Sequence, residues 1–220
     1  MKSNVYLLGL VLLVITILTA CTSGSSLNNS VKKQIVEHIK IVEESEYDLI
    51  YFNKSHKQYH EAINELVGEE YWASTGDDIV FGYDNETYTK DTLTDMAQEE
   101  YDKHKESRLN VIREIGMDKL NAKVRISEVY EGKESNQANV YTLEIKELMD
   151  QPFTATTKKY SIEKRGEKWL ITNVERDKVT LNNDMTAEEV EKEIQNIDYQ
   201  THEGKAVHYP TVFILSGVGK

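Results

Sequence analysis

Chemistry at the start of this 220-residue chain centres on its single cysteine, Cys21. An apolar run from Val5 to Ile17 precedes it, and Lys2 supplies a positive charge ahead of that run. A cationic start, an apolar core and small residues before a cut are the three parts of an export signal, so residues 1–20 are predicted to be a signal peptide. An exported chain with one cysteine cannot form an internal disulfide, and a free thiol would be a liability there. This favours a modified Cys21.

The tetrapeptide Leu18-Thr19-Ala20-Cys21 resembles the lipobox of bacterial lipoproteins. In that family the peptide bond before the cysteine is cut, and the cysteine sulfur carries a diacylglyceryl group. The resemblance implies signal cleavage between Ala20 and Cys21, lipid attachment at Cys21, and a place at the outer face of the bacterial cytoplasmic membrane. Two acyl chains, with about 0.8 kcal/mol for each buried methylene, would hold the chain there stably. The alternative is an ordinary secretory signal or an uncleaved anchor, with Cys21 incidental.

Composition divides the rest of the chain into a tether, one domain and a tail. Residues 21–29 are small and polar, which predicts a flexible tether. We expect a domain over residues 30–178 and a C-terminal helix and tail over residues 179–220. The chain has 38 acidic and 26 basic residues, a net charge of −12. Nucleic acid is an unsuitable partner, because binding to phosphates needs clustered Lys and Arg.

Two helical regions are predicted before residue 117. The segment 30–66, interrupted near residues 53–55, has apolar residues at helical spacing, namely Val31, Ile35, Ile39 and Val42. A further helix would be capped by Thr89 or Thr92 and stop at Gly116. Between the two regions, residues 79–81 are either a short strand or a buried loop.

Beyond Gly116 the apolar period changes from helical to two, which is typical of strands. We predict four strands joined by short turn-like links, around residues 122–126, 139–145, 153–164 and 169–174. Such strands form an antiparallel meander, and the upstream helices have apolar stripes that can cover one of its faces. The predicted fold class is therefore α+β.

Helices followed by a four-stranded meander resemble the nuclear transport factor 2-like fold, and the stretch Tyr-Ser-Ile-Glu-Lys-Arg-Gly-Glu-Lys-Trp-Leu-Ile (residues 160–171) is similar to the final hairpin of small exported members. The resemblance implies a curved sheet that wraps a long helix into a cone with a cavity at its wide end. Members often dimerise through the open sheet face, so a second copy of this chain is one expected partner. Enzymatic members use an Asp or His deep in the cone, but we assign no catalytic residue here.

The tail contains two further signals. Thr186 and Glu189 have the spacing of a capping box, which predicts a short helix. The apolar segment 206–215 is either an added strand or a partly disordered end. Tyr199 to Tyr209 resembles the opening of an amidase-like domain, but the chain ends before the catalytic residues of such a domain. This resemblance raises the alternative of an accessory to a cell-wall enzyme.

His56 and His60 stand four residues apart on a predicted helix, a spacing that can present two imidazoles to one metal ion. The sequence His-Lys-Gln-Tyr-His lacks the glutamate of a metalloprotease helix, and no third ligand is evident. A solvated polar face is the favoured interpretation, and we expect no metal or cofactor. The 13 tyrosines are interpreted as packing residues rather than the lining of a ligand cavity.

These observations predict a membrane-anchored extracytoplasmic protein without enzymatic activity. Its domain would bind another component of the cell envelope, which we expect to be a protein. Small-molecule binding or catalysis in the cone cavity is the second hypothesis. An accessory role beside a cell-wall enzyme is the third.

Overall fold

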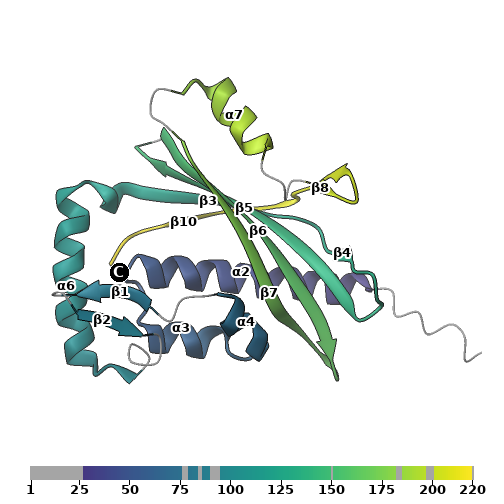
Figure 1. The fold of residues 1–220 in the computed structure, drawn as a ribbon, viewed down its shortest axis with the longest axis horizontal. Coiled ribbons are helices and arrows are strands. Elements are labelled where there is room, and N and C mark those ends of the chain that lie inside the picture. Colours follow the sequence, from purple (N-terminus) through teal and green to yellow (C-terminus); the bar gives the residue numbers. More distant parts are fainter. Residues whose placement is uncertain are drawn as a thin grey trace, which may run out of the picture.

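The computed structural model describes residues 27–75, 79–83, 86–89, 95–149, 151–181, 185–196 and 201–219. Most of its helices come first in the chain, and a curved antiparallel sheet follows them (Figure 1). The predicted α+β class is therefore confirmed. The predicted signal peptide, its cleavage site and Cys21 lie outside the described residues. No helix within those ranges combines the length and the apolar content that crossing a bilayer requires.

The longest helix, α2 (Asn29–Ile50), forms where the sequence predicts an apolar stripe. Its apolar residues at full burial are Ile35, Ile39 and Val42. The Asn28 side chain caps the helix by accepting a hydrogen bond from the backbone N–H of Val31 at 2.9 Å. The helical region therefore begins as predicted, and Leu27 just before it is already part of the core.

The predicted break after α2 is confirmed. Residues 51–55 are not helical, and Phe52 adopts a left-handed backbone with a φ of 60° that a helix cannot contain. Helix α3 (His56–Ile63) then starts from a capping box, in which Ser55 and Gln58 each bond the backbone of the other. Helix α4 (Glu69–Ser74) completes the N-terminal helices.

A hairpin and one more helix lead into the sheet. Strands β1 (Ile79–Tyr83) and β2 (Glu86–Thr89) pair antiparallel, so residues 79–81 are a strand rather than a loop. Helix α6 (Gln98–Glu114) has Ala97 at its N-cap, and the predicted start at Thr89 is wrong because Thr89 pairs with Ile79 in the hairpin. Thr92 lies outside the described residues. The predicted stop is confirmed, because Gly116 takes a φ of 73°.

The main sheet has six strands, so the prediction of four was too few. Its strands are β3 (Leu120–Ile126), β4 (Tyr130–Glu131), β5 (Gln137–Leu148), β6 (Gln151–Arg165), β7 (Lys168–Thr180) and β10 (Thr211–Ser216). They follow the order β10-β3-β5-β6-β7, and the short β4 pairs with β5. The sequence left open whether the segment 206–215 forms a strand, because the partner of β10, strand β3, lies far away in the sequence. Phe213 of β10 stands opposite Val124 of β3.

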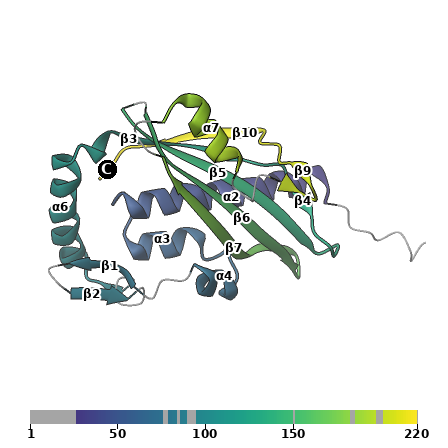
Figure 2. The same ribbon diagram turned by 45° about the horizontal axis from the view of Figure 1, so that its top comes forward.

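Helices cover both faces of this sheet (Figure 2). On the concave face, Ile39 and Val42 of α2 pack against Val124, Val140 and Ile171. On the outer face, α7 (Ala187–Gln195) brings Ile194 onto the apolar residues Leu143, Ile145, Ala155 and Leu181. The capping box of Thr186 and Glu189 is present as predicted. A small hairpin, β8 (Thr201–His202) and β9 (Lys205–Ala206), precedes β10.

We predict that Ile39→Ala lowers the free energy of unfolding by about 2–5 kcal/mol, because the Ile39 side chain is 0% exposed in the main core. Urea denaturation monitored by circular dichroism measures the loss. The control is Val111→Ala, at a residue that is 47% exposed, for which a change within about 0.5 kcal/mol is expected. Equal losses for the two variants would contradict this description of the core.

Candidate functional site

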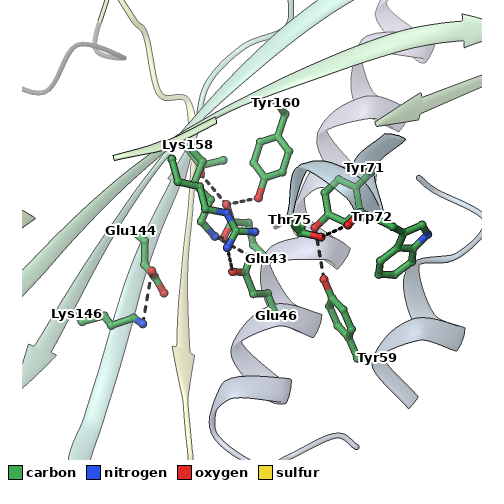
Figure 3. Close-up of polar contacts among 12 residues, drawn as sticks. Glu43, Glu46, Tyr59, Tyr71, Trp72, Thr75, Glu144, Lys146, Lys158 and Tyr160 are labelled. Carbon is green, nitrogen blue, oxygen red and sulfur yellow. Dashed lines mark hydrogen bonds and ion pairs between the residues drawn. The ribbon is translucent and has the colours of Figure 1, made fainter. Parts of the chain in front are cut away.

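The concave face of the sheet holds a buried network of charged and hydroxyl groups (Figure 3). At its centre is Glu43 of α2, whose side chain is only 1% exposed. One carboxylate oxygen of Glu43 accepts hydrogen bonds from the hydroxyls of Thr142, at 2.6 Å, and Tyr160, at 2.9 Å. The other accepts a 2.6 Å bond from Nζ of Lys158. Three residues of β5 and β6 thus hold one carboxylate of the helix.

A second carboxylate, on Glu46, extends the network toward β7. Its two oxygens accept from Nζ of Lys158 at 3.0 Å and from Nη1 of Arg176 at 2.8 Å. Burial by itself would raise the pKa of Glu46, but the positive charges of Lys158 and Arg176 outweigh it and lower the pKa to about 2. Burial likewise disfavours charged Lys158, and the two glutamates raise its pKa above the ordinary range.

Glu144 on the neighbouring strand β5 behaves differently. Its nearest cation is Lys146, with Nζ at 3.8 Å from the carboxylate. Burial is the largest influence on it and raises the pKa of Glu144, although Lys158 and Lys146 oppose the rise. The carboxylates of the concave face are therefore unequal: Glu46 is held charged, and Glu144 is biased toward its neutral form.

The chemistry of this network is structural rather than catalytic. A general acid or base must reach a substrate proton, whereas the oxygens of Glu43 and the ammonium of Lys158 are bonded to groups of the protein itself. The sequence analysis did not identify this network. The sequence contained two signals of it. Glu43 lies four residues after Ile39 on the apolar stripe, and Lys158 lies two residues before Tyr160, on the same inward side of β6.

The structure separates the two histidines that were weighed as metal ligands. His56 is buried on the same side of α3 as Tyr59 and Ile63, so the favoured solvated polar face is wrong for this residue. Tyr59 and Ile63 follow His56 by three and seven residues, and this helical spacing places His56 on the core stripe. The ring of His60 instead stacks on Trp72, with centroids 4.8 Å apart. Within the described ranges, no group of three or more His, Cys, Asp or Glu residues could hold a metal ion.

The interpretation of the tyrosines as packing residues agrees with the burial of those that the structure describes in the helical half. The buried ones are Tyr47, Tyr51, Tyr59, Tyr71 and Tyr101. The hydroxyls of Tyr59 and Tyr71 lie 3.4 Å apart and form a hydrogen bond (Figure 3). Burial raises the pKa of Tyr101 to about 12, so its hydroxyl stays protonated, and it donates to the carbonyl of Lys54 at 3.0 Å.

The two edges of the main sheet differ in how they are protected. At the β7 edge, Gly68 donates its backbone N–H to the carbonyl of Ile171 at 2.8 Å, and Ile171 donates to the carbonyl of Leu66 at 3.0 Å. The chain leading into α4 therefore covers this edge at Ile171, and the second half of β7 contains the charged run 175–178. Such coverage and charge are the usual means by which a sheet avoids pairing with other chains.

The β10 edge differs from the β7 edge in its lack of charge. Among the described strands, β10 pairs only with β3. Its sequence, Thr-Val-Phe-Ile-Leu-Ser, contains no charge and no proline. Phe213 and Leu215 pack inward on the core, while Val212 and Ile214 point outward and are 51% and 69% exposed. An uncharged apolar edge of this kind marks either an interaction surface or an aggregation hazard.

A groove runs beside the start of β10 and is bounded on its other side by α2. It has a volume of about 520 Å³, and its apolar lining includes Val36, Val129, Pro210, Val212 and Phe213. Three lysines and two glutamates complete the lining, namely Lys32, Lys33, Lys40, Glu37 and Glu128. Nζ of Lys40 lies 5.8 Å from the ring centre of Phe213. The groove and the exposed side chains of β10 form one continuous surface, which we call the β10 surface.

A second cavity, of about 390 Å³, lies where the β8–β9 hairpin meets the outer face of the sheet. The hydroxyl of Tyr141 bonds Nδ1 of His202 at 2.8 Å, and Tyr130 stacks on the His202 ring at 4.4 Å. The hydroxyl of Tyr130 also accepts from the backbone N–H of His208 at 2.9 Å. These contacts secure the segment that enters β10, and so they position the β10 surface.

The chain matches no protein-family model and no curated protein at a significant level. The features that bear on its function are therefore the β10 surface and the sequence that precedes the described residues.

We predict that Lys158→Met destabilises the protein by about 3–5 kcal/mol, because it leaves the buried carboxylate of Glu43 without a positive partner. Urea denaturation at pH 7 measures the loss. The double variant Lys158→Met, Glu43→Gln should recover part of it, since the amide removes the buried charge. A double variant that is less stable than Lys158→Met would contradict this role for Glu43.

The lowered pKa of Glu46 predicts acid sensitivity. A carboxyl whose pKa is lower in the folded state than its ordinary value of 4.5 stabilises the fold above that value and loses this contribution as the pH falls toward about 2. The free energy of unfolding should therefore decrease over that interval, and Glu46→Gln should make the decrease shallower. Glu144→Gln is the control: because the pKa of Glu144 is raised, Glu144 affects stability at pH values above 4.5, and its replacement should leave the decrease below 4.5 unchanged. Identical acid profiles for the wild type and Glu46→Gln would contradict the assignment.

Proposed function

We propose that this chain is a lipid-anchored extracytoplasmic protein that binds another protein of the cell envelope and has no catalytic activity. The observation that carries the binding role is the β10 edge, where Val212 and Ile214 are exposed on an uncharged strand beside a groove. The lipobox-like tetrapeptide ending at Cys21 supports the anchor.

The fold that we propose is the nuclear transport factor 2-like cone. Support comes from the order of the elements, helices before a curved antiparallel sheet, and from the position of α2 against the concave face. The alternative function, ligand binding or catalysis inside the cone, is disfavoured. Glu43, Lys158 and Tyr160, the polar residues at that position, already satisfy one another.

The proposed anchor keeps the domain close to the bilayer. Asn29, the first residue of α2, lies eight positions after Cys21, and a fully extended chain over eight steps spans at most about 28 Å. The first turns of α2 contribute Lys32 and Lys33 to the groove. The proposed partner is therefore a membrane-associated protein of the envelope, within reach of this short tether.

The anchor is tested with Cys21→Ala in the full chain, produced in the native host. The variant should leave the membrane fraction and fail to incorporate radiolabelled palmitate, because the sulfur that carries the lipid is gone. Thr22→Ala, the matched control, should stay in the membrane and keep the label. Membrane attachment of Cys21→Ala at the wild-type level would contradict the lipid anchor.

The binding role is tested separately by treating intact cells with an amine-reactive crosslinker and identifying the captured proteins by mass spectrometry. The proposal predicts one dominant envelope protein in the wild type. Its recovery should fall in Cys21→Ala, since the chain no longer stays beside the membrane. Failure to capture any protein reproducibly would contradict the binding role.

A further inference from the structure

We infer that the cavity between the β8–β9 hairpin and the outer face of the main sheet is a binding site for an uncharged saccharide. The site is separate from the β10 surface, because the cavity and the groove beside β10 share no lining residue. It therefore adds a second role to the proposed protein binding and does not depend on it. The volume of the cavity, about 390 Å³, falls within the range of about 300–1,000 Å³ that is usual for ligand sites.

Strands β5 and β6 form the floor of the cavity. On β5, Gln137 and Asn139 line it and alternate with Ala138 and Val140, which belong to the core of the concave side. Successive side chains of a strand point to opposite faces, so the two amides point to the outer face. Ser161 of β6 stands opposite Asn139 and also lines the cavity.

The amides and the hydroxyl of this floor have unused hydrogen-bonding capacity. Gln137, Asn139 and Ser161 are partly buried, and within the described ranges their side chains form no hydrogen bond with the protein. An amide has two N–H donors and a carbonyl acceptor, and a hydroxyl both donates and accepts. Such groups on adjacent strands match a ligand that donates and accepts at neighbouring atoms, as the vicinal hydroxyls of a saccharide do.

The β8–β9 hairpin forms one wall of the cavity and adds aromatic surface. Its turn is tight, because Glu203 and Gly204 have φ values of 50° and 76°, both positive as in a two-residue type I′ turn. His202 is held by the hydroxyl of Tyr141 and by the ring of Tyr130. Tyr141 and His202 both line the cavity. Rings of this kind combine apolar surface with a polar group, which suits the C–H faces and hydroxyl edges of a sugar ring.

The charges of the lining favour an uncharged ligand. Five charged side chains line the cavity, namely Glu131, Lys133, Lys159, Glu163 and Glu203. Three of them form ion pairs, Glu131 with Lys32, Lys159 with Glu175 and Glu163 with Arg165. The other two, Lys133 and Glu203, have opposite signs. The cavity therefore has no excess of one charge with which to attract an anion or a cation.

A peptide is the main alternative, because its backbone also donates and accepts hydrogen bonds. Extended peptides are usually recognised by an exposed strand at the edge of a sheet. The floor of this cavity is instead made by β5 and β6, which both have paired strands on their two sides. The backbone groups of the floor are thus already used within the sheet, and the side chains are left to bind a compact ligand.

The test measures saccharide binding to the full, lipid-bearing chain, purified in a detergent without sugar groups. The probes are cellobiose, lactose, maltose and diacetylchitobiose, observed by saturation-transfer NMR. We expect at least one of them to bind with a dissociation constant of about 1 mM or lower. Lactose 3′-sulfate and deacetylated chitobiose, which carry charges, should bind at least about tenfold more weakly than the best uncharged probe. The uncharged peptide acetyl-triglycine amide should not bind.

Variants of the cavity test its contacts. Gln137→Ala with Asn139→Ala removes both amides and should weaken binding of the best probe by about tenfold. Ser161→Phe fills the cavity and should abolish binding. The matched control, Asn121→Ala with Asn173→Ala, removes two amides of the same sheet that do not line the cavity and should change the affinity by less than about twofold. Circular dichroism confirms that each variant is folded.

A second arm identifies the source of the saccharide. If the chain sediments with protein-free cell walls of its native host and Ser161→Phe does not, the ligand is a glycan of the envelope. If only the soluble probes bind, it is a free sugar, and both results support the inference. The inference is overturned if no saccharide binds, if the peptide or a charged probe binds more tightly than every uncharged saccharide, or if the cavity variants bind like the wild type. In those cases the proposed protein binding stands, because crosslinking tests it separately.

Discussion

The structure depends on ion pairs between two carboxylates of one buried helix and two cations of the sheet. Glu43 and Glu46 lie on α2, and Lys158 and Arg176 lie on β6 and β7. A buried charge that loses its partner costs several kcal/mol, so a shift of α2 along the sheet would be strongly opposed. Apolar packing around Ile39 supplies much of the stability but is less directional. The ion network is what selects one position for the helix against the curved sheet.

This fixed position has consequences for the rest of the molecule. With α2 held against β5, β6 and β7, the chain after α3 reaches the β7 edge, where residues 66–68 bond to Ile171. At the opposite side, the first half of α2 stands beside β10, and a groove remains between them. The polar groups of the interior thus stabilise the fold, and the surface best suited to binding lies at one edge of the sheet.

Local patterns were sufficient to predict much of this fold. The stripe of Ile35 and Ile39 identified α2, and alternating residues identified β3, β5, β6 and β7. Features that depend on long-range contacts were not predicted. Nothing near Thr211 in the sequence indicates that β10 pairs with β3, and the bond between Glu43 and Lys158 joins residues 115 positions apart. For the same reason the β10 surface was absent from the sequence analysis. Its apolar segment was recognised, but whether it formed a strand depended on a partner elsewhere in the chain.

The most direct test of the central claim is hydrogen–deuterium exchange at the backbone amides of β10, measured by mass spectrometry on the full chain. The exchange is compared between the purified chain in detergent and the chain in membranes of its native host. Backbone amides that a bound protein shields from water become protected from exchange. The account predicts slower exchange across residues 211–216 in the membranes, with unchanged exchange in β7. Equal exchange in both samples, or new protection confined to another surface, would contradict it.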